Sequence, residues 1–224
     1  MHKSGFVNIV GNPNVGKSTL MNTLVGERIS IITSKAQTTR HRIMGIVNGE
    51  DFQIVYSDTP GVLKPNYKLQ ESMLGFSTSA LKDADILLYV TDTVENGMKN
   101  SDFIEKVKKQ HAPVLLIINK IDLTDQQKLE ALVAQWKEIL PNAEIIPVSA
   151  ANKFNIDYVL KRIKDLLPEC PPYFEKDALT DKPARFFVTE IIREKILTKY
   201  DRAIPYAVAV VVEQFKDSDL LIRI

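Results

Sequence analysis

The chain has 224 residues, 45% of them hydrophobic, and nearly balanced charges, with 29 Lys and Arg against 28 Asp and Glu. This composition is typical of a globular protein and excludes disordered, collagen-like and mucin-like chains. A net charge of +1 gives no strong overall field that would attract nucleic acid or an anionic membrane. The length predicts one domain of about 150–180 residues and a smaller second part.

Cysteine content and hydropathy bear on the cellular compartment. The single cysteine, Cys170, excludes an internal disulfide and is typical of a reducing compartment. The N-terminus lacks the apolar segment of a signal peptide, and runs such as Val114–Ile118 are far shorter than the roughly 20 residues that span a bilayer. We therefore expect a cytoplasmic protein.

The first 166 residues alternate short apolar runs with helical patterns, which predicts an α/β fold: a mostly parallel sheet with helices on both faces. Strands are expected at Phe6–Val10, His41–Asn48, Phe52–Asp58, Ile86–Asp92, Val114–Asn119 and Ile145–Ser149. Helices are expected at Lys17–Val25, Leu69–Leu81, Asp102–Gln110, Gln126–Ile139 and Ile156–Leu166. Thr124, with Gln127 three residues later, predicts a capping box for the fourth helix.

The remainder of the chain begins with prolines that predict a stiff, extended linker ending at Pro183. A helix is expected at Arg185–Leu197, followed by strands at Tyr206–Phe215 and Leu220–Ile224. These elements enclose too little core to fold alone, so we expect a partial second domain that continues past the last residue. The expected division is residues 1–167, a linker at 168–184, and residues 185–224.

GNPNVGKS at Gly11–Ser18 fits the phosphate-loop pattern and lies between an expected strand and an expected helix. Its glycines let successive backbone N–H groups point at phosphate oxygens, assisted by the helix N-terminus. Lys17 would bind the outer phosphates, and the Ser18 hydroxyl would complete a Mg²⁺ shell. The alternative, a glycine-rich turn without a ligand, fits this setting poorly.

Asp58-Thr59-Pro60-Gly61 ends the third expected strand. The carboxylate can hold Mg²⁺ through water, and the glycine N–H can turn toward a γ-phosphate. By itself this sequence is also an ordinary β-turn, so it depends on the phosphate loop for its interpretation.

Asn119-Lys120-Ile121-Asp122 follows an expected central strand and therefore emerges at the carboxyl edge of the sheet, where ligands bind in such folds. Asp122 can accept two hydrogen bonds from guanine N1–H and N2–H₂, a pair that adenine lacks. Asn119 would tie this loop to the phosphate loop, and the Lys120 stem would lie on the base. Ser149-Ala150 can offer a backbone N–H to the base carbonyl.

These four motifs in this order resemble the translation-factor-like class of GTP-binding proteins. The resemblance implies GTP or GDP and Mg²⁺ as ligands, with Lys17, Thr39 and Gly61 as catalytic residues and Ser18, Thr39 and Asp58 at the metal. Lys35–Arg40 falls in the first switch loop of that class, where Thr39 is favoured as the Mg²⁺-sensing residue and Thr38 is the alternative. The full set expected at the nucleotide is Gly11, Asn12, Pro13, Asn14, Val15, Gly16, Lys17, Ser18, Thr19, Asp58, Thr59, Pro60, Gly61, Val62, Asn119, Lys120, Ile121, Asp122, Ser149 and Ala150.

Val62 stands where many small GTPases have a glutamine that orients the attacking water. The chain therefore resembles the hydrophobic-substituted GTPases. In that group, an asparagine at the position of Asn14 is associated with a K⁺ ion beside the phosphates. A simple turn residue is the alternative for Asn14.

EIIREKIL at Glu190–Leu197, Ala203–Val208, Val212–Phe215 and AQTTRHRI at Ala36–Ile43 make the chain similar to the Era family of GTPases, in which an RNA-binding KH module follows the GTPase domain. The resemblance implies that the protein binds ribosomal RNA of the small subunit and the small ribosomal subunit. It also implies peripheral association with the inner membrane, and we expect a monomer. The family's GXXG loop does not occur after Pro183, so no RNA-contacting residues can be assigned.

Three functions are therefore weighed. The first is a GTP-hydrolysing switch that assists small-subunit assembly, with slow turnover in the absence of a partner. The second is an RNA-binding assembly factor that uses nucleotide as a gating ligand with little turnover. The third is a sibling GTPase of tRNA modification or ribosome assembly; in a tRNA-modifying sibling the GTPase should be inserted in a helical domain, which the start of the motifs near residue 5 disfavours.

Overall fold

The computed structural model describes residues 1–35, 37–94, 100–200, 208–218 and 221–223. Six strands form the central sheet in the order β2-β3-β1-β4-β5-β6, and β2 is antiparallel to β3 while the other neighbours are parallel. The strands are β1 (Lys3–Gly11), β2 (Ile43–Asn48), β3 (Phe52–Asp58), β4 (Ile86–Asp92), β5 (Val114–Asn119) and β6 (Glu144–Pro147). The expected mostly parallel α/β sheet is therefore confirmed.

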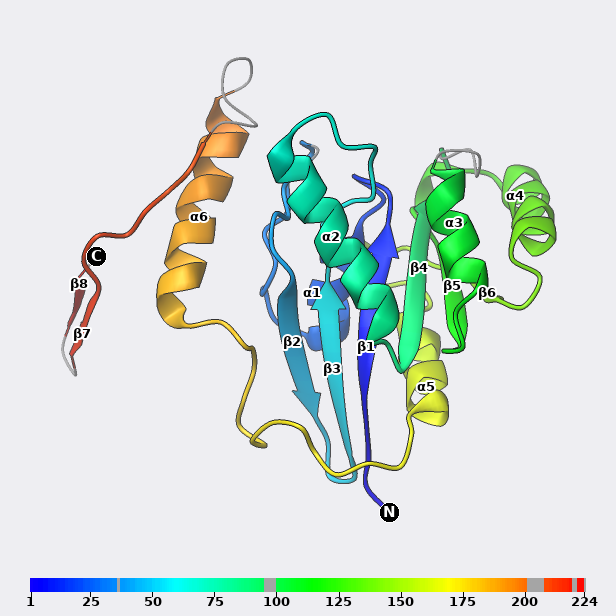
Figure 1. Cartoon of the computed structure of the whole chain (residues 1–224). Helices are drawn as coiled ribbons and strands as arrows, with labels where there is room; N and C mark the ends of the chain where they lie inside the picture. The colour runs from blue at the N-terminus through cyan, green and yellow to red at the C-terminus, as the bar shows by residue number, and fades with distance from the viewer. Residues whose placement is uncertain (36, 95–99, 201–207, 219–220, 224) are drawn as a thin grey trace.

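Helices cover both faces of this sheet (Figure 1). They are α1 (Lys17–Val25), α2 (Lys68–Lys82), α3 (Ser101–Lys108), α4 (Gln126–Ile139) and α5 (Ile156–Leu166), with a short 3₁₀ helix η1 (Ile121–Leu123) after β5. Side chains of α1 and α5 pack in one apolar core, and those of α2, α3 and α4 pack in a second core. The central strands are apolar on both faces because each face is covered.

The capping box predicted at Thr124 is wrong. Asp125 is the N-cap of α4, and its carboxylate accepts a hydrogen bond from the Lys128 N–H at 2.9 Å. Thr124 instead ends η1, with its N–H directed to the Ile121 carbonyl. The aspartate wins because an ionised carboxylate is the stronger acceptor for the first free N–H groups of a helix.

The predicted ends of three strands also differ from the structure. β1 is longer than the expected Phe6–Val10 and runs over Lys3–Gly11. β6 ends at Pro147, and Ser149 forms only an isolated bridge with Phe154. β2 starts at Ile43, because Arg40 and the two residues after it belong to the preceding loop.

The proline-containing segment after α5 is bound along the sheet. The buried Gln53 side chain accepts hydrogen bonds from the N–H groups of Tyr173 (2.7 Å) and Phe174 (2.9 Å). Further along, the Ile46 N–H donates to the Leu179 carbonyl at 2.8 Å, and Thr180 forms a bridge with Gly45. The segment thus covers the outer edge of β2, which would otherwise present unpaired backbone groups to solvent.

The segment leads to helix α6 (Ala184–Lys199), which lies to one side of the sheet, and then to a hairpin of β7 (Lys216–Ser218) and β8 (Leu221–Arg223) (Figure 1). The strand predicted over Tyr206–Phe215 is wrong for its described part, Val208–Phe215, which forms no strand. A β-strand needs a hydrogen-bonded neighbour, and here the carbonyls of Val208 and Val212 accept from arginine side chains instead. Tyr206 and Ala207, like Leu220 and Ile224 at the ends of the last predicted strand, lie outside the described residues. In the described part of the chain, no helix is long and apolar enough to span a membrane.

Candidate nucleotide-binding site

The phosphate loop joins β1 to α1 and needs glycine at two positions. Gly11 has φ 148° and Gly16 has φ 92°, which are left-handed values that other residues rarely adopt. A Cβ at Gly11 would lie 2.1 Å from the Val90 carbonyl oxygen, and one at Gly16 would lie 2.3 Å from Asn119 Nδ2. The two glycines therefore let the loop pass close to β4 and to the end of β5.

Lys17 begins α1 and is 6% exposed. Its ammonium group donates to the Asn12 carbonyl at 2.8 Å, so the side chain folds back over the loop. This geometry places a fixed positive charge among the backbone N–H groups at a helix N-terminus, where an anion is stabilised.

Ser18, Thr39 and Asp58 meet at the end of β3, although they are far apart in sequence. Ser18 Oγ lies 2.7 Å from Asp58 Oδ2 and 3.1 Å from Thr39 Oγ1, and Thr39 Oγ1 lies 3.3 Å from the same carboxylate oxygen. Burial raises the pKa of the Asp58 carboxyl, and the nearby Lys17 charge and the hydroxyl groups oppose that shift. The second oxygen, Oδ1, is buried and has no hydrogen-bond partner among the described residues. Two hydroxyls beside a carboxylate with a spare oxygen are the hard ligands that suit Mg²⁺.

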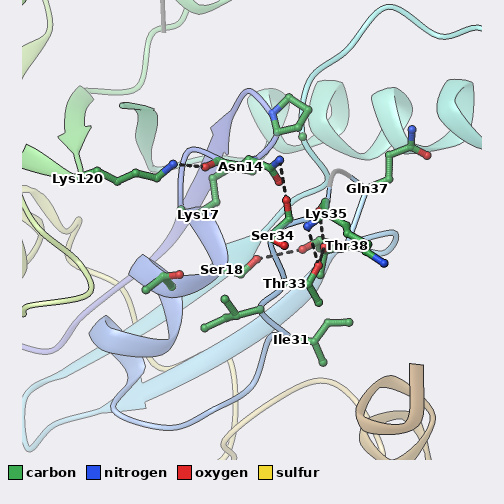
Figure 2. Close-up of a pocket in the computed structure, with 16 residues that line it drawn as sticks. Asn14, Lys17, Ser18, Ile31, Thr33, Ser34, Lys35, Gln37, Thr38 and Lys120 are labelled. Atoms are coloured by element: carbon green, nitrogen blue, oxygen red, sulfur yellow. Dashed lines mark hydrogen bonds between the residues drawn. The ribbon is translucent and has the colours of Figure 1, made fainter. Parts of the chain in front are cut away.

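The two candidate threonines have different surroundings. Thr39 is 8% exposed and is the one that joins Ser18 and Asp58. The Thr38 hydroxyl contacts Thr33 Oγ1 at 2.5 Å and the Lys35 carbonyl at 2.6 Å, within its own loop (Figure 2).

The Asn119 side chain joins three loops at the carboxyl edge of the sheet. Its Nδ2 donates to the Val15 carbonyl at 2.9 Å, and its Oδ1 accepts from the Ala150 N–H at 3.0 Å. Lys120 reaches across to the phosphate loop, with Nζ 2.5 Å from the Asn14 carbonyl oxygen (Figure 2). Asp122 Oδ1 accepts from the Ser149 hydroxyl at 2.5 Å, which orients the carboxylate.

Two details at this edge were not anticipated from the sequence. Lys120 also pairs with Asp92 at 2.8 Å, at the end of β4. The N–H groups of Ser149 and Ala150 already have internal acceptors, because Ser149 N–H donates to the Phe154 carbonyl at 3.3 Å and Ala150 N–H to Asn119. Asp92 ends β4 at the carboxyl edge of the sheet, as Asn119 ends β5. This position is the one sequence signal that could have identified Asp92.

A cavity of about 410 Å³ lies over the phosphate loop. Figure 2 shows the phosphate-loop residues on one side of it and, on the other, the labelled residues Ile31, Thr33, Ser34, Lys35, Gln37 and Thr38. The expected residues on its wall are Pro13, Asn14, Gly16, Lys17, Ser18, Thr19, Thr39, Gly61 and Lys120. Val62 is not on this wall; its side chain is 3% exposed and packs in the core beneath α2 and α3.

Helix α6 holds the opposite wall of the cavity, a contact that its sequence did not indicate. Arg193 donates to the Thr38 carbonyl at 2.6 Å, and Glu194 accepts from the Ile32 N–H at 3.1 Å and pairs with Arg28. Arg193 also pairs with Glu190, and all three α6 residues are buried. Ile191 and Ile192 on this helix are exposed, whereas its buried residues are Glu190, Arg193, Glu194 and Leu197.

Comparisons with known proteins agree with this geometry. Residues 6–120 match the family described as 50S ribosome-binding GTPase. The chain is 43% identical to GTPase Era of Clostridium perfringens over 220 residues, which is 98% of this chain and 74% of that protein. It is 45% identical to GTPase Era of Caldicellulosiruptor saccharolyticus over 224 residues, covering 98% of this chain and 75% of that one.

Solved structures give the same result. A crystal structure of Era in complex with MgGDPNP and nucleotides 1506–1542 of 16S ribosomal RNA matches with a TM-score of 0.92 and 36% identity, over 98% of this chain and 75% of that one. A point variant of Aquifex aeolicus Era bound to GDP.AlF4- matches with a TM-score of 0.91 and 37% identity, over 97% of this chain and 75% of that one.

Proposed function

The chain belongs to the Era family of GTPases, and on that basis we propose that it is a Mg²⁺-dependent, GTP-hydrolysing switch that binds small-subunit ribosomal RNA and assists assembly of the small ribosomal subunit. The proposal that the chain binds GTP rests on the hydrogen bonds of the Asn119 side chain, which join the phosphate loop to the expected guanine-binding motif at one edge of the sheet. The RNA part is supported by the relative that was solved with 16S ribosomal RNA.

The roles of the nucleotide residues follow from their positions. Lys17 and the loop N–H groups would bind the β- and γ-phosphates, and the Gly61 N–H would meet the terminal one. Ser18, Thr39 and Asp58 would hold Mg²⁺, which neutralises charge that develops on the phosphate oxygens. The buried Asp58 carboxyl with its unpartnered oxygen supports this fit. Asp122, oriented by Ser149, would accept hydrogen bonds from guanine.

Base selectivity tests the Asp122 role directly. We expect tight binding of GDP and GTP, no measurable ATP binding, and a shift of preference toward xanthine nucleotides in Asp122→Asn, because an amide can donate to the second carbonyl of xanthine. The exposed Asp51→Asn is the matched control and should bind GTP as the wild type does. Equal affinity of the wild type for ATP and GTP would contradict the assignment.

Slow turnover follows from Val62, which is buried away from the cavity and supplies no group to orient water. We propose that K⁺ beside Asn14 assists hydrolysis, since Asn14 lies on the cavity wall with its amide directed to the Ser34 carbonyl at 3.2 Å. Hydrolysis should therefore be faster in KCl than in NaCl of equal ionic strength, and Asn14→Ala should abolish that difference. Fast hydrolysis by the isolated protein in NaCl would contradict both statements.

The domain division at residues 1–167, 168–184 and 185–224 remains part of the proposal, with the last segment as the first part of a KH-like module. It is supported by the exposed Ile191 and Ile192 on α6, which offer apolar surface for further core. Because Arg193 and Glu194 contact the cavity wall, a change in the bound nucleotide would be transmitted to this module.

The alternative of an RNA-binding factor that merely senses nucleotide shares every contact above. Phosphate release and binding of the 3′ end of 16S ribosomal RNA should be measured for Lys17→Ala and Thr39→Ala. For a hydrolysing switch, both variants lose phosphate release and Thr39→Ala still binds GDP. Wild-type RNA binding that responds to GTP without any phosphate release would favour the alternative.

Localisation and assembly complete the proposal. We propose a cytoplasmic monomer with peripheral association with the inner membrane. Cell fractionation with a salt wash and sedimentation of the purified chain test these points.

A further inference from the structure

Asn100 precedes α3, and its side chain is used away from that helix. Its backbone is left-handed, with φ 61° and ψ 44°, and the side chain makes no capping bond to α3. Asparagine at this position ordinarily accepts a hydrogen bond from the first turn of its own helix. Here the amide Nδ2 instead lies 2.6 Å from Asn12 Oδ1 and 2.9 Å from the Val62 carbonyl oxygen.

The first of these contacts is in the phosphate loop. Asn12 is 6% exposed, and its backbone carbonyl accepts the Lys17 ammonium group. Asn12 therefore contacts Lys17 through its backbone and Asn100 through its side chain. A change at Asn100 therefore acts on the loop at Asn12, whereas Asn119 holds it at Val15.

The second contact fixes the peptide groups around Val62. The Val62 N–H donates to the Gly11 carbonyl at 3.0 Å, while its own carbonyl accepts from Asn100. The residue is thus bound on both sides of its backbone. Gly61 is confined as well, because a Cβ there would lie 2.7 Å from Pro13 atoms. The position of the Gly61 N–H at the cavity is therefore set by its neighbour.

We propose that Asn100 is a positioning residue for GTP hydrolysis that holds the Val62 carbonyl, and with it the Gly61 N–H, against the phosphate loop. The inference rests on the proposed function of this same cavity. It gives a reason why a chain with valine at position 62 can hydrolyse GTP: with no side chain to orient water, the geometry at the terminal phosphate depends on the backbone. The amide of Asn100 bonds to the Asn12 side chain and the Val62 carbonyl, whereas Asn119 and Lys17 bind the backbone of the phosphate loop, so GDP affinity should change much less than kcat.

Asn100→Gly and Asn100→Asp test this role. Glycine adopts φ 61° without strain, so Asn100→Gly removes the amide and keeps the backbone. Aspartate also tolerates this conformation but places an acceptor against two acceptor oxygens. We expect kcat to fall about 10-fold in Asn100→Gly and at least as far in Asn100→Asp, since each tenfold change corresponds to the loss of roughly one hydrogen bond in the transition state. KM for GTP and the Kd for GDP should stay within about twofold.

Asn155→Gly is the matched control. Asn155 is the N-cap of α5, has φ 62°, makes no capping bond, and donates from its amide to the Pro147 carbonyl at 2.9 Å. Its loss should lower the thermal midpoint about as much as the loss of Asn100, while kcat is unchanged. Binding of GDP with aluminium fluoride gives a second readout, and it should weaken in Asn100→Gly more than binding of GDP alone.

An Asn100→Gly variant with wild-type kcat overturns the inference. So does a kcat that falls only in step with GDP affinity or with thermal stability, because a purely structural role would have that effect. The wild-type rate separates this inference from the function on which it rests. A wild type without GTP hydrolysis overturns both, whereas active wild type with equally active Asn100→Gly overturns the inference alone.

Discussion

The two sides of the candidate nucleotide site are held in place by different kinds of contact. On the base side, the Asn119 amide binds backbone groups of Val15 and Ala150, all at the carboxyl edge of one sheet. On the switch side, the loop from Arg28 to Thr39 depends on side chains of α6, an element from the other end of the chain.

We therefore expect the base side to determine the affinity for nucleotide and the switch side to determine the rate of turnover. The strand ends on the base side are fixed by the buried sheet, so we expect them to form a preorganised site. The switch side rests on a few long-range side-chain contacts, and segments held in this way open more easily than a sheet core. Four substitutions test the comparison, in order of decreasing effect.

Arg193→Ala should release the switch side. It leaves Glu190 buried without its partner, and breaking a buried ion pair in this way costs about 3–5 kcal/mol. Hydrogen exchange of the α6 amides should accelerate accordingly, while guanine selectivity is unchanged. Lys195→Ala, exposed on the same helix, is the control. Unchanged protection of α6 would show that this contact does not hold the wall.

Asn119→Ala should break the base side. It leaves the Val15 carbonyl and the Ala150 N–H unpaired in a buried place, so affinity for GTP and GDP should fall about 100-fold. Isothermal titration calorimetry measures this loss, with the exposed Asn142→Ala as the reference. An affinity within a few-fold of the wild type would contradict a preorganised base wall.

Gly61→Ala should affect turnover more than binding. The new Cβ would lie 2.7 Å from backbone atoms of Pro13, so the segment Asp58–Val62 must shift. We expect kcat to fall about 10-fold with GDP affinity nearly unchanged. Gly75→Ala in α2 meets no atom within 4 Å and should instead raise stability by about 0.5–1 kcal/mol. Equal losses of kcat and GDP affinity in Gly61→Ala would place Gly61 in the binding wall.

Glu144, the first residue of the edge strand β6, gives the smallest effect. Hydrogen bonds from the Arg162 guanidinium lower the pKa of this carboxyl below its usual value. The carboxylate therefore stabilises the fold above the pKa of the unfolded chain, and this contribution disappears as the pH falls through the lower, folded pKa. Glu144→Gln should lower the thermal midpoint by about 1–2 °C at pH 7 and by less at pH 3. A difference that grows at pH 3 would reverse the assigned sign.

Local patterns predicted the sheet and its helices well. Gln126–Ile139, Phe52–Asp58 and Val114–Asn119 have the bounds that their apolar runs predicted. Prediction from local patterns fails where two signals compete, as they do for the N-cap at Thr124 and Asp125. It also fails where a strand needs a hydrogen-bonded partner, as from Val208 to Phe215. Propensity describes one segment at a time, whereas pairing is a property of two.

The nucleotide motifs could be read from the sequence because each is a short run of fixed spacing at the end of a strand, and parallel strand ends meet at one edge. Three kinds of contact could not be read from the sequence. They are the charged contacts of Arg193 and Glu194, the pairing of Asp92 with Lys120, and the hydrogen bond of the Asn100 amide to Asn12. In each of these cases the partner is distant in sequence and no spacing links the two residues. The motifs alone thus predicted which residues would surround the phosphates and the base. Which side chains hold the switch wall against them emerged only from the folded chain, because packing rather than periodicity brings those side chains together.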